Sequence, residues 1–453
     1  MARVVPIHKK NSRDQVGNYR PISILPVASK ILEKHVSIHL YEFLTSHNLL
    51  HHRQSGFRPN HSCESALTLM MEDWLSALNS GSRIGLLLVD LCKAFDLVNH
   101  TLLIRKLKLY KCNTTTLNWF KSYISDRRQS VKIQDIASDP LKIKSGVPQG
   151  SILGPLLFII FINDIFLEDG LGDIDIFADD AVAHQKGSSK EEINNKLQQC
   201  ADSFQGWCLR NYMVLSIEKT KTMYISNRQN IVQNFANSIK INDISIEEVD
   251  LTKLLGITIS NTLSWDRQVG QVKKCASYRL SLLRKIRKYL PFETRILFYN
   301  YYVKPTIEYC SSIWGNCSKH NTLQVIKIQK KAARLILDAD PLTPSKLMFQ
   351  KLQWLPFDEI VKFKQSCLVF KAVNGDAPPY IQNMFINARD HTEYTLRSST
   401  NSKLFVPRTH HNSLSYTGVA VWNTLPENVK SAETFDKFKK FYVKLTLDKL
   451  KRS

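Results

Sequence analysis

The chain has 453 residues, 43% of them hydrophobic, and a formal net charge of +22 with a pI near 9.5. The longest apolar run, residues 156–162, is far shorter than the roughly 20 residues that span a bilayer, and the start of the chain lacks the apolar region of a signal peptide. We therefore expect an intracellular protein without a membrane partner. The positive charge favours a polyanion, with nucleic acid the simplest choice.

The nine cysteines are scattered and include no Cys-x-x-Cys pair, which predicts reduced and mostly buried thiols. Cys310, Cys317 and His320 come nearest to a zinc cluster, but a fourth ligand and the usual spacing are missing. Cys92 is interpreted as a packing residue, because a thiolate is too soft for magnesium.

The first elements in chain order are helices predicted over residues 30–50 and 64–78, followed by a short apolar run at residues 84–89. Such a run is typical of a buried strand. Asp90 follows it directly and would emerge where the strand ends. A glycine- and proline-containing loop, Ser145–Ser151, comes next among the informative segments, and a helix is predicted over residues 152–167.

Residues 173–178 alternate at first between polar and apolar, which predicts a half-buried strand, and residues 181–184 form its return strand. Asp179 and Asp180 then lie near a tight turn. A solvated turn is the simpler explanation for two adjacent aspartates, but ionised carboxylates beside apolar flanks need a partner. Together with Asp90 they could hold two magnesium ions, which bind hard oxygen ligands and promote phosphoryl transfer.

A further helix is predicted over residues 190–212. Between residues 265 and 340, 15 Lys or Arg stand against 5 Asp or Glu, an excess of +10, and tyrosines are interleaved among them. Helices with one packed and one basic face are expected here, and such a face can follow a phosphate backbone; a merely solvated helix surface is the alternative. Residues 341–453 are less legible and are expected to be mainly helical.

Several of these segments resemble motifs of one enzyme family, and they occur in the family's order between residues 4 and 260. Asp90–Asp96 resembles motif A of reverse transcriptases in the form found in non-LTR retrotransposons, Ser145–Pro155 resembles motif B, and Phe177–Asp180 resembles motif C. Two fingers motifs, motif D and the primer-grip hairpin are matched by Asn18–Ser23, Gln54–Pro59, Lys219–Lys221 and Leu254–Ile257. The chain is therefore similar to the reverse transcriptases of jockey-like elements.

The resemblance implies an α+β fold of the right-hand polymerase type, in which an antiparallel palm sheet is backed by helices. We expect the fingers and palm in residues 1–260, a basic helical thumb in residues 261–340, and a mainly helical C-terminal extension of unknown role in residues 341–453.

The resemblance also implies an RNA-directed DNA polymerase, a nucleotidyltransferase that extends a DNA primer along an RNA template with deoxynucleoside triphosphates. Asp90, Asp179 and Asp180 would be the catalytic residues and would ligate two Mg²⁺ ions, with Mn²⁺ as a substitute. One ion would activate the primer's 3′-hydroxyl, and the other would hold the triphosphate and the leaving pyrophosphate.

Nucleotide-binding roles are carried over to six further residues, and three of them, Phe95, Arg20 and Lys219, also have a simpler explanation. Phe95 matches the position that excludes a 2′-hydroxyl, or is ordinary aromatic core. Arg58 would pair with triphosphate oxygens, whereas Arg20 could equally form an interdomain salt bridge. Gln149 and Gly150 lie in a loop whose backbone can approach a nucleotide closely. Lys219 would protonate or neutralise pyrophosphate, or is a surface lysine.

The sequence departs from the family pattern at Phe177, where tyrosine is usual, and at Ser216, where asparagine is common. We expect the endonuclease domain of such elements to be absent from this chain. A catalytically dead, nucleic-acid-binding remnant and a different polymerase with the same palm, such as an intron-type maturase or an RNA-copying enzyme, remain as alternatives. The family's habit of priming at chromosomal DNA implies action in the nucleus after assembly with RNA in the cytoplasm.

Overall fold

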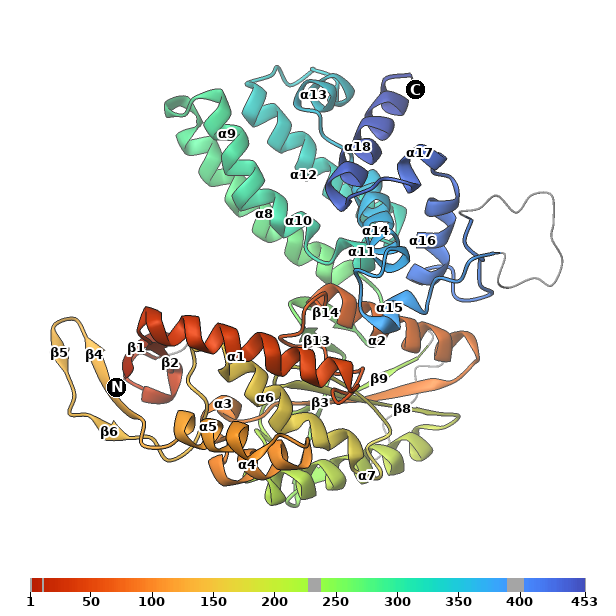
Figure 1. The fold of residues 1–453 in the computed structure, drawn as a ribbon. Helices are drawn as coiled ribbons and strands as arrows, with labels where there is room; N and C mark the ends of the chain where they lie inside the picture. The colour runs from red at the N-terminus through yellow and green to blue at the C-terminus, as the bar shows by residue number, and fades with distance from the viewer. Residues whose placement is uncertain (1, 10–11, 227–237, 389–402, 453) are drawn as a thin grey trace. The chain divides into compact units, whose positions relative to one another are not determined.

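The computed structural model describes residues 2–9, 12–226, 238–388 and 403–452. The chain divides into two compact units (Figure 1). The first unit is built from residues 1–59, 85–222 and 234–248, and the second from residues 60–84, 223–233 and 249–453. Helices and strands alternate in the first unit and helices dominate the second, so the expected α+β class is confirmed.

One sheet of the first unit joins the start of the chain to a segment that follows residue 127. Its strands are β1 (Ala2–His8), β2 (Tyr19–Ile24), β4 (Arg128–Ile133), β5 (Ile136–Ala137) and β6 (Leu141–Lys142). β1 pairs antiparallel with β2 and parallel with β4. This sheet places Arg20 on β2, opposite Ile7 of β1.

A second sheet carries the aspartates. Its order is β12-β9-β3-β8-β7, and the strands are β12 (Glu247–Glu248), β9 (Lys221–Ile225), β3 (Arg83–Val89), β8 (Asp180–Gly187) and β7 (Asp173–Phe177). β7 and β8 are antiparallel, as expected for a hairpin. The two-residue strand β12, however, runs parallel to β9. The sheet is therefore mixed and not wholly antiparallel as predicted. Two short strands, β10 (Lys240–Ile241) and β11 (Ile244–Ser245), precede β12 and pair with each other, so β12 is not the return strand of a hairpin with β9.

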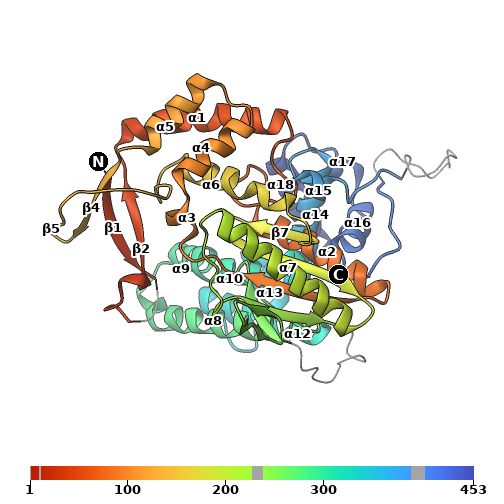
Figure 2. The same cartoon turned by 90° about the horizontal axis from the view of Figure 1, so that it is seen from below.

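The helices of the first unit are α1 (Val27–Ser46), α3 (Ala94–Leu97), α4 (His100–Leu109), α5 (Thr114–Ile124), α6 (Gly154–Ile162), which continues as a 3-10 turn over Asn163–Leu167, and α7 (Lys190–Arg210). Three of them, α1, α6 and α7, lie close to their predicted positions, and the other three were not predicted from the sequence. A further 3-10 turn covers Val16–Asn18. Figure 2 shows α1, α4, α5 and α6 gathered together.

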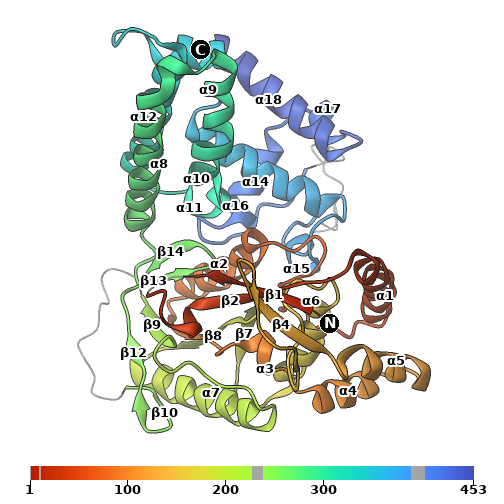
Figure 3. The ribbon, with the colours of Figure 1, turned by 90° about the vertical axis from the view of Figure 1, so that its left-hand side faces the viewer.

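Local chemistry explains two of these helices. α7 begins at Ser189, whose side chain accepts a hydrogen bond from the backbone N–H of Glu192. It packs along the second sheet (Figure 3), and a Cβ at Gly85 of β3 would lie 2.2 Å from Ile193 of α7. Glycine therefore allows the helix to approach the sheet. α6 is apolar on all sides and is correspondingly buried, as expected for a core helix.

The second unit begins with α2 (Cys63–Asn79), which a capping box at Ser62 and Ser65 starts. The predicted hairpin is present as β13 (Leu251–Leu254) and β14 (Ile257–Ser260). Its turn needs positive φ at both positions, 43° at Leu255 and 90° at Gly256. The Tyr309 hydroxyl donates a hydrogen bond of 2.8 Å to the Leu255 carbonyl and thereby braces this turn.

The remaining helices of the second unit follow the hairpin. They are α8 (Asp266–Ile286), α9 (Phe292–Phe298), α10 (Lys304–Glu308), α11 (Ser311–Trp314), α12 (Lys319–Leu337), α13 (Ser345–Leu352), α14 (Phe357–Val373), α15 (Pro379–Gln382), α16 (Leu414–Asn423), α17 (Glu427–Lys430) and α18 (Phe435–Arg452), with a 3-10 turn at Arg287–Tyr289 and a π-helical turn at Tyr299–Val303.

α8 has the two faces predicted from the sequence. Val269, Val272, Ala276, Leu280 and Leu283 are buried at helical spacing, whereas Lys274, Arg284 and Lys285 are exposed. All nine cysteines are free thiols, and Cys275 of α8 is exposed. In the described part of the chain, every helix is too short or too polar to cross a bilayer.

Candidate active site

Asp179 lies in the turn between β7 and β8, and Asp180 is the first residue of β8, paired with Phe177. The turn depends on a left-handed backbone at Ala178, where φ is 61°. Residues 53–56 line this hairpin, because Ser55 N–H donates 2.8 Å to the Ile176 carbonyl. A Cβ at Gly56 would lie 2.2 Å from the Ala178 nitrogen, so the glycine of the fingers motif permits the close approach to the aspartate turn.

A buried ion pair fixes the strand beneath this turn. Asp175 of β7 is 3% exposed, and its Oδ2 lies 3.0 Å from Arg53 Nη1 and 3.0 Å from His184 Nε2 on β8. Buried carboxylates need such partners. The pair connects the segment before Gly56 to both strands of the hairpin, which limits movement of the turn.

Asp90 follows the last residue of β3. Its carbonyl accepts a 2.8 Å hydrogen bond from the Ser216 N–H, so the predicted motif D segment lies beside the end of β3. The Asp90 Oδ2 is 2.9 Å from Lys219 Nζ. Asp90 raises the pKa of Lys219 through this hydrogen bond, so the lysine remains a cation at neutral pH.

The three carboxylates influence one another. Reduced hydration in the turn, then the charges of Asp179 and Asp90, raise the pKa of Asp180 to about 6. Burial, and more weakly the charge of Asp90, raises the pKa of Asp179, while Lys9 and Arg20 act in the opposite direction. Asp90 is thus near the hairpin turn. In the described chain, however, no choice of one oxygen from each of the three carboxylates places all three within 4.8 Å of one another.

The donor set is suited to a hard divalent cation. It consists of carboxylate oxygens, the ligands that Mg²⁺ and Mn²⁺ prefer, and two of the carboxylates have raised pKa values. Burial, and the charges of the neighbouring carboxylates, disfavour the ionised forms of Asp179 and Asp180, and a bound divalent cation would offset both effects.

The motif B loop docks on the segment that follows Asp90. Gln149 Nε2 donates 3.0 Å to Asp96 Oδ1, and the Gly146 N–H donates 2.8 Å to the Val98 carbonyl. On its other side, the Gln149 carbonyl accepts a 2.6 Å hydrogen bond from the Ser23 N–H of β2. Gly150 has a φ of +114°, and a Cβ there would lie 2.5 Å from the Ser23 carbonyl oxygen. The loop therefore links β2 to motif A.

Phe95 is half-buried in α3, between two other rings. It stacks on Phe158 with centroids 4.4 Å apart and meets Phe57 edge-on at 5.8 Å. These contacts fix the orientation of the ring, which agrees with both the core and the steric-gate interpretation.

Arg58 contacts the backbone of its own loop. Its Nη1 donates 2.8 Å to the His51 carbonyl and 2.9 Å to the Gln54 carbonyl, so the guanidinium braces its own loop. Triphosphate binding by Arg58 stays a prediction. Arg20, by contrast, acts on the Asp179 carboxylate electrostatically.

Sequence reasoning missed two charged residues. Lys9 follows β1 and acts on both Asp179 and Asp180, but nothing distinguishes it locally from other surface lysines. Asp96 binds Gln149, and burial raises its pKa. Its place at the end of the motif A segment was the available signal.

A family model described as reverse transcriptase (RNA-dependent DNA polymerase) matches residues 7–259. Among curated proteins, the probable RNA-directed DNA polymerase from transposon BS of Drosophila melanogaster is 27% identical over 75% of this chain and 38% of its own length. The probable RNA-directed DNA polymerase from transposon X-element of the same species is 26% identical over 79% and 40%, and the RNA-directed DNA polymerase from mobile element jockey is 27% identical over 75% and 38%. The chain spans about two fifths of the length of these relatives.

Among solved structures, apo telomerase from Candida tropicalis covers 79% of this chain and 65% of its own, with 13% identity and a TM-score of 0.39. A telomerase from Candida albicans in complex with a fragment of telomeric RNA covers 80% and 63%, with a TM-score of 0.37.

Proposed function

The chain belongs to the reverse transcriptase (RNA-dependent DNA polymerase) family, and on that premise we propose that it synthesises DNA on an RNA template by nucleotidyl transfer at Asp90, Asp179 and Asp180. The resemblance to jockey-like elements expected from the motifs is confirmed by the curated relatives. The observation that carries the proposal is the meeting of the Asp90 strand end with the Asp179–Asp180 turn, beside the Lys219 cation.

Asp90, Asp179 and Asp180 would hold two divalent cations. When bound, these ions lower the barrier to transfer by stabilising the attacking and leaving oxygens. The chain's own contribution is to bring the end of β3 and the hairpin turn together, so that the three carboxylates face the same site. Lys219 contributes a fixed positive charge. Because its pKa is raised, neutralising pyrophosphate is favoured over donating a proton to it.

The motif B loop and Phe95 would shape the nucleotide site. Gln149 is oriented by Asp96, and its loop is tied to β2, so a nucleotide would meet a preorganised backbone. The Phe95 ring, held by Phe158, would exclude a 2′-hydroxyl by contact. Arg20 and Arg58 would pair with triphosphate oxygens.

The right-hand arrangement is part of the same proposal. Residues 1–260 would form fingers and palm, residues 261–340 the thumb, and residues 341–453 the C-terminal extension. The exposed basic side of α8 supports contact with a primer–template duplex, and β13–β14 would support the primer. The partners are then an RNA template, a DNA primer and deoxynucleoside triphosphates, with action in the nucleus.

Primer extension on poly(rA)/oligo(dT) with Mg²⁺ tests the proposal. Asp179→Asn should lower the extension rate by more than about a hundredfold, because a group that stabilises the transition state is lost, while the template Kd stays unchanged. Asp173→Asn is the matched control, since it removes a carboxylate from the other end of the same hairpin.

Near-normal extension by Asp179→Asn would contradict the assignment of the site. No extension by the wild type, together with salt-sensitive RNA binding, would instead identify a nucleic-acid-binding remnant.

A further inference from the structure

One face of α2 meets segments from the end of the chain, within the second unit. Ser65, Leu69 and Glu72 are spaced i, i+4 and i+7 and therefore share that face. The Tyr380 hydroxyl lies 3.2 Å from Ser65 Oγ. Leu69 belongs to a buried apolar cluster whose other members are Ala372, Ala377, Tyr380 and Ile381. The contact between α2 and the C-terminal extension thus has an apolar centre with a hydrogen bond beside it.

Glu72 binds the first turn of α16. Its Oε1 accepts hydrogen bonds from the Leu414 N–H and, at 3.1 Å, from the Ser415 N–H. Its Oε2 accepts one of 2.6 Å from the Ser415 hydroxyl. The first N–H groups of a helix have no partner within the helix, and a carboxylate there is favoured by the helix dipole. Glu72 therefore acts as a capping group for a helix more than 340 residues further along the chain.

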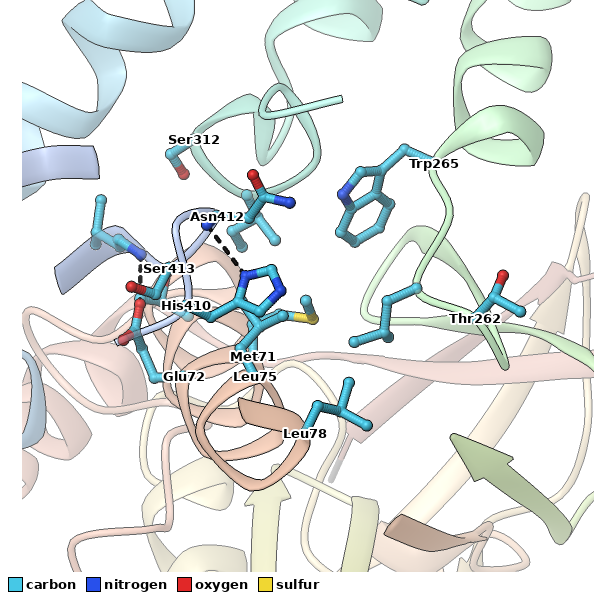
Figure 4. A pocket seen from close by; sticks show the side chains of 14 residues that line it. Met71, Glu72, Leu75, Leu78, Thr262, Trp265, Ser312, His410, Asn412 and Ser413 are labelled. Atoms are coloured by element: carbon cyan, nitrogen blue, oxygen red, sulfur yellow. Dashed lines mark hydrogen bonds between the residues drawn. The ribbon is translucent and has the colours of Figure 1, made fainter. Parts of the chain in front are cut away.

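A cavity of about 170 Å³ lies beside this contact. Figure 4 shows Met71, Leu75 and Leu78 of α2 on one side, with Trp265 and Asn412 also lining it. Apolar atoms facing a void lack partners for dispersion contact. At this end of the contact, α2 is therefore attached to the chain before α16 by the hydrogen bonds of Glu72 more than by close packing.

The chain before α16 is itself held in place. The Asn412 N–H donates 3.2 Å to His410 Nδ1, drawn as a dashed line in Figure 4. Asn316 Nδ2 lies 3.3 Å from the Asn412 carbonyl and 3.3 Å from Thr417 Oγ1. In turn, Gln365 Nε2 on α14 donates 3.0 Å to Asn316 Oδ1. Glu72 thus binds a segment that α14 and the turn after α11 already fix.

We propose that α15, α16 and the turn at residues 410–413 brace α2, and that Glu72 is a positioning residue for DNA synthesis. α2 ends at Asn79 and the next element, β3, ends immediately before Asp90. The chain thus passes directly from α2 into β3, and a helix fixed at Glu72 restrains the start of the segment that leads to Asp90. The functional half of this inference rests on the proposed polymerase activity; the brace itself does not.

Full-length variants test both halves. Glu72→Ala removes all three hydrogen bonds, and Glu72→Gln keeps a neutral acceptor. Ser415→Ala removes the hydroxyl that donates to Glu72 and also contacts Ser413 Oγ, but it leaves the two backbone donors in place. Val429→Ala is the comparator, because Val429 is buried in a cluster formed by the C-terminal extension alone. It lowers stability without touching α2.

Hydrogen exchange of the α2 amides should become about tenfold faster in Glu72→Ala, as expected for lost hydrogen bonds to a charged group. Glu72→Gln and Ser415→Ala should show smaller increases, and Val429→Ala none. At a temperature where all variants are folded, Glu72→Ala should lower kcat for single-nucleotide addition about tenfold with an unchanged KM for the primer–template, and Glu72→Gln should recover part of it.

Unchanged α2 exchange in Glu72→Ala would overturn the brace. Equal loss of kcat in Glu72→Ala and Val429→Ala would overturn the positioning role and leave only a general loss of stability. If the wild type extends no primer, the polymerase proposal fails separately, and the exchange measurement still decides whether the C-terminal extension holds α2.

Discussion

Asp179 and Asp180 are subject to two opposing demands. The hairpin turn takes them partly out of water, which disfavours their charged forms, and Asp90 adds a further negative charge. Metal binding needs both groups ionised. Lys9 and Arg20 reduce the conflict at Asp179; Arg20 belongs to the first fingers motif, whereas Lys9 lies outside the motifs. The pH response of the protein should expose this balance.

The pKa of Asp180 is about 6 in the folded protein, against 3.8 for an unperturbed group. Between these values the folded protein holds a proton that the unfolded chain has released, so stability from this group is complete below pH of about 4 and is lost as the pH rises through about 6. In EDTA, the thermal midpoint of the wild type should fall over this window relative to that of Asp180→Asn. If the thermal midpoints of the two proteins change with pH in the same way, the raised pKa of Asp180 is contradicted.

Phe95 leads to a second prediction at this scale. Phe95→Ala removes the ring that would meet a 2′-hydroxyl, so incorporation of ribonucleotides relative to deoxynucleotides should rise at least about tenfold, measured by competitive single-nucleotide addition. Phe57→Ala is the control, because it removes a ring that only touches Phe95 edge-on. Equal effects of both variants would reduce Phe95 to a packing residue.

At the scale of the elements, the turn of the β13–β14 hairpin is held by a neighbouring side chain, that of Tyr309. The turn has Gly256 at a φ of +90°, and a Cβ there would lie 2.9 Å from the Tyr309 ring. The same tyrosine holds the Leu255 carbonyl. Gly256 is required both by its left-handed backbone and by the nearness of the Tyr309 ring. A glycine with a left-handed backbone but no close neighbour separates these two effects.

Gly375 has a φ of +77° with open space around its Cβ position. Gly375→Ala should cost only the left-handed backbone, about 1 kcal/mol, whereas Gly256→Ala should cost about 1–3 kcal/mol more through overpacking. Urea denaturation measures both. Adding Tyr309→Ser to Gly256→Ala should restore part of the difference, and identical costs for the two glycine variants would show that the ring yields freely.

For the molecule as a whole, the net charge of +22 predicts strongly salt-dependent binding of nucleic acid. Exposed basic residues occur on several helices, and charge alone does not say which of them touch the backbone of the nucleic acid. α8 and α18 offer comparable sets of exposed cations in different parts of the second unit.

Replacing Lys274, Arg284 and Lys285 of α8 by glutamine should weaken RNA–DNA duplex binding and flatten the plot of log Kd against log salt by about 2 to 3, the contribution of three phosphate contacts. Filter binding across a salt series measures the slope. The control replaces Lys440, Lys444 and Lys449 of α18, and an equal flattening there would remove the special role of residues 261–340.

Whether an element or a contact could be predicted from the sequence depended on how far apart in the chain the interacting residues lie. The strand before Asp90, the hairpin at Asp179 and the boundaries of α2 were expected from local patterns, because period, turn chemistry and caps act within a few residues. The parallel pairing of β12, the role of Lys9 and the use of Arg58 to brace its own loop were not. Each depends on which distant or competing partner the folded backbone brings near, and no local pattern specifies that choice.

The bond between Glu72 and Ser415 joins residues 343 positions apart. At about 5–20 residues per second, a ribosome needs roughly 20 to 70 s to deliver the second partner after the first. During that interval α2, apolar on most of its sides, has emerged into the cell without the surface that will cover it. During synthesis of this protein there is therefore an interval in which the hydrophobic surface of α2 is accessible to chaperones, to proteases and to other nascent chains.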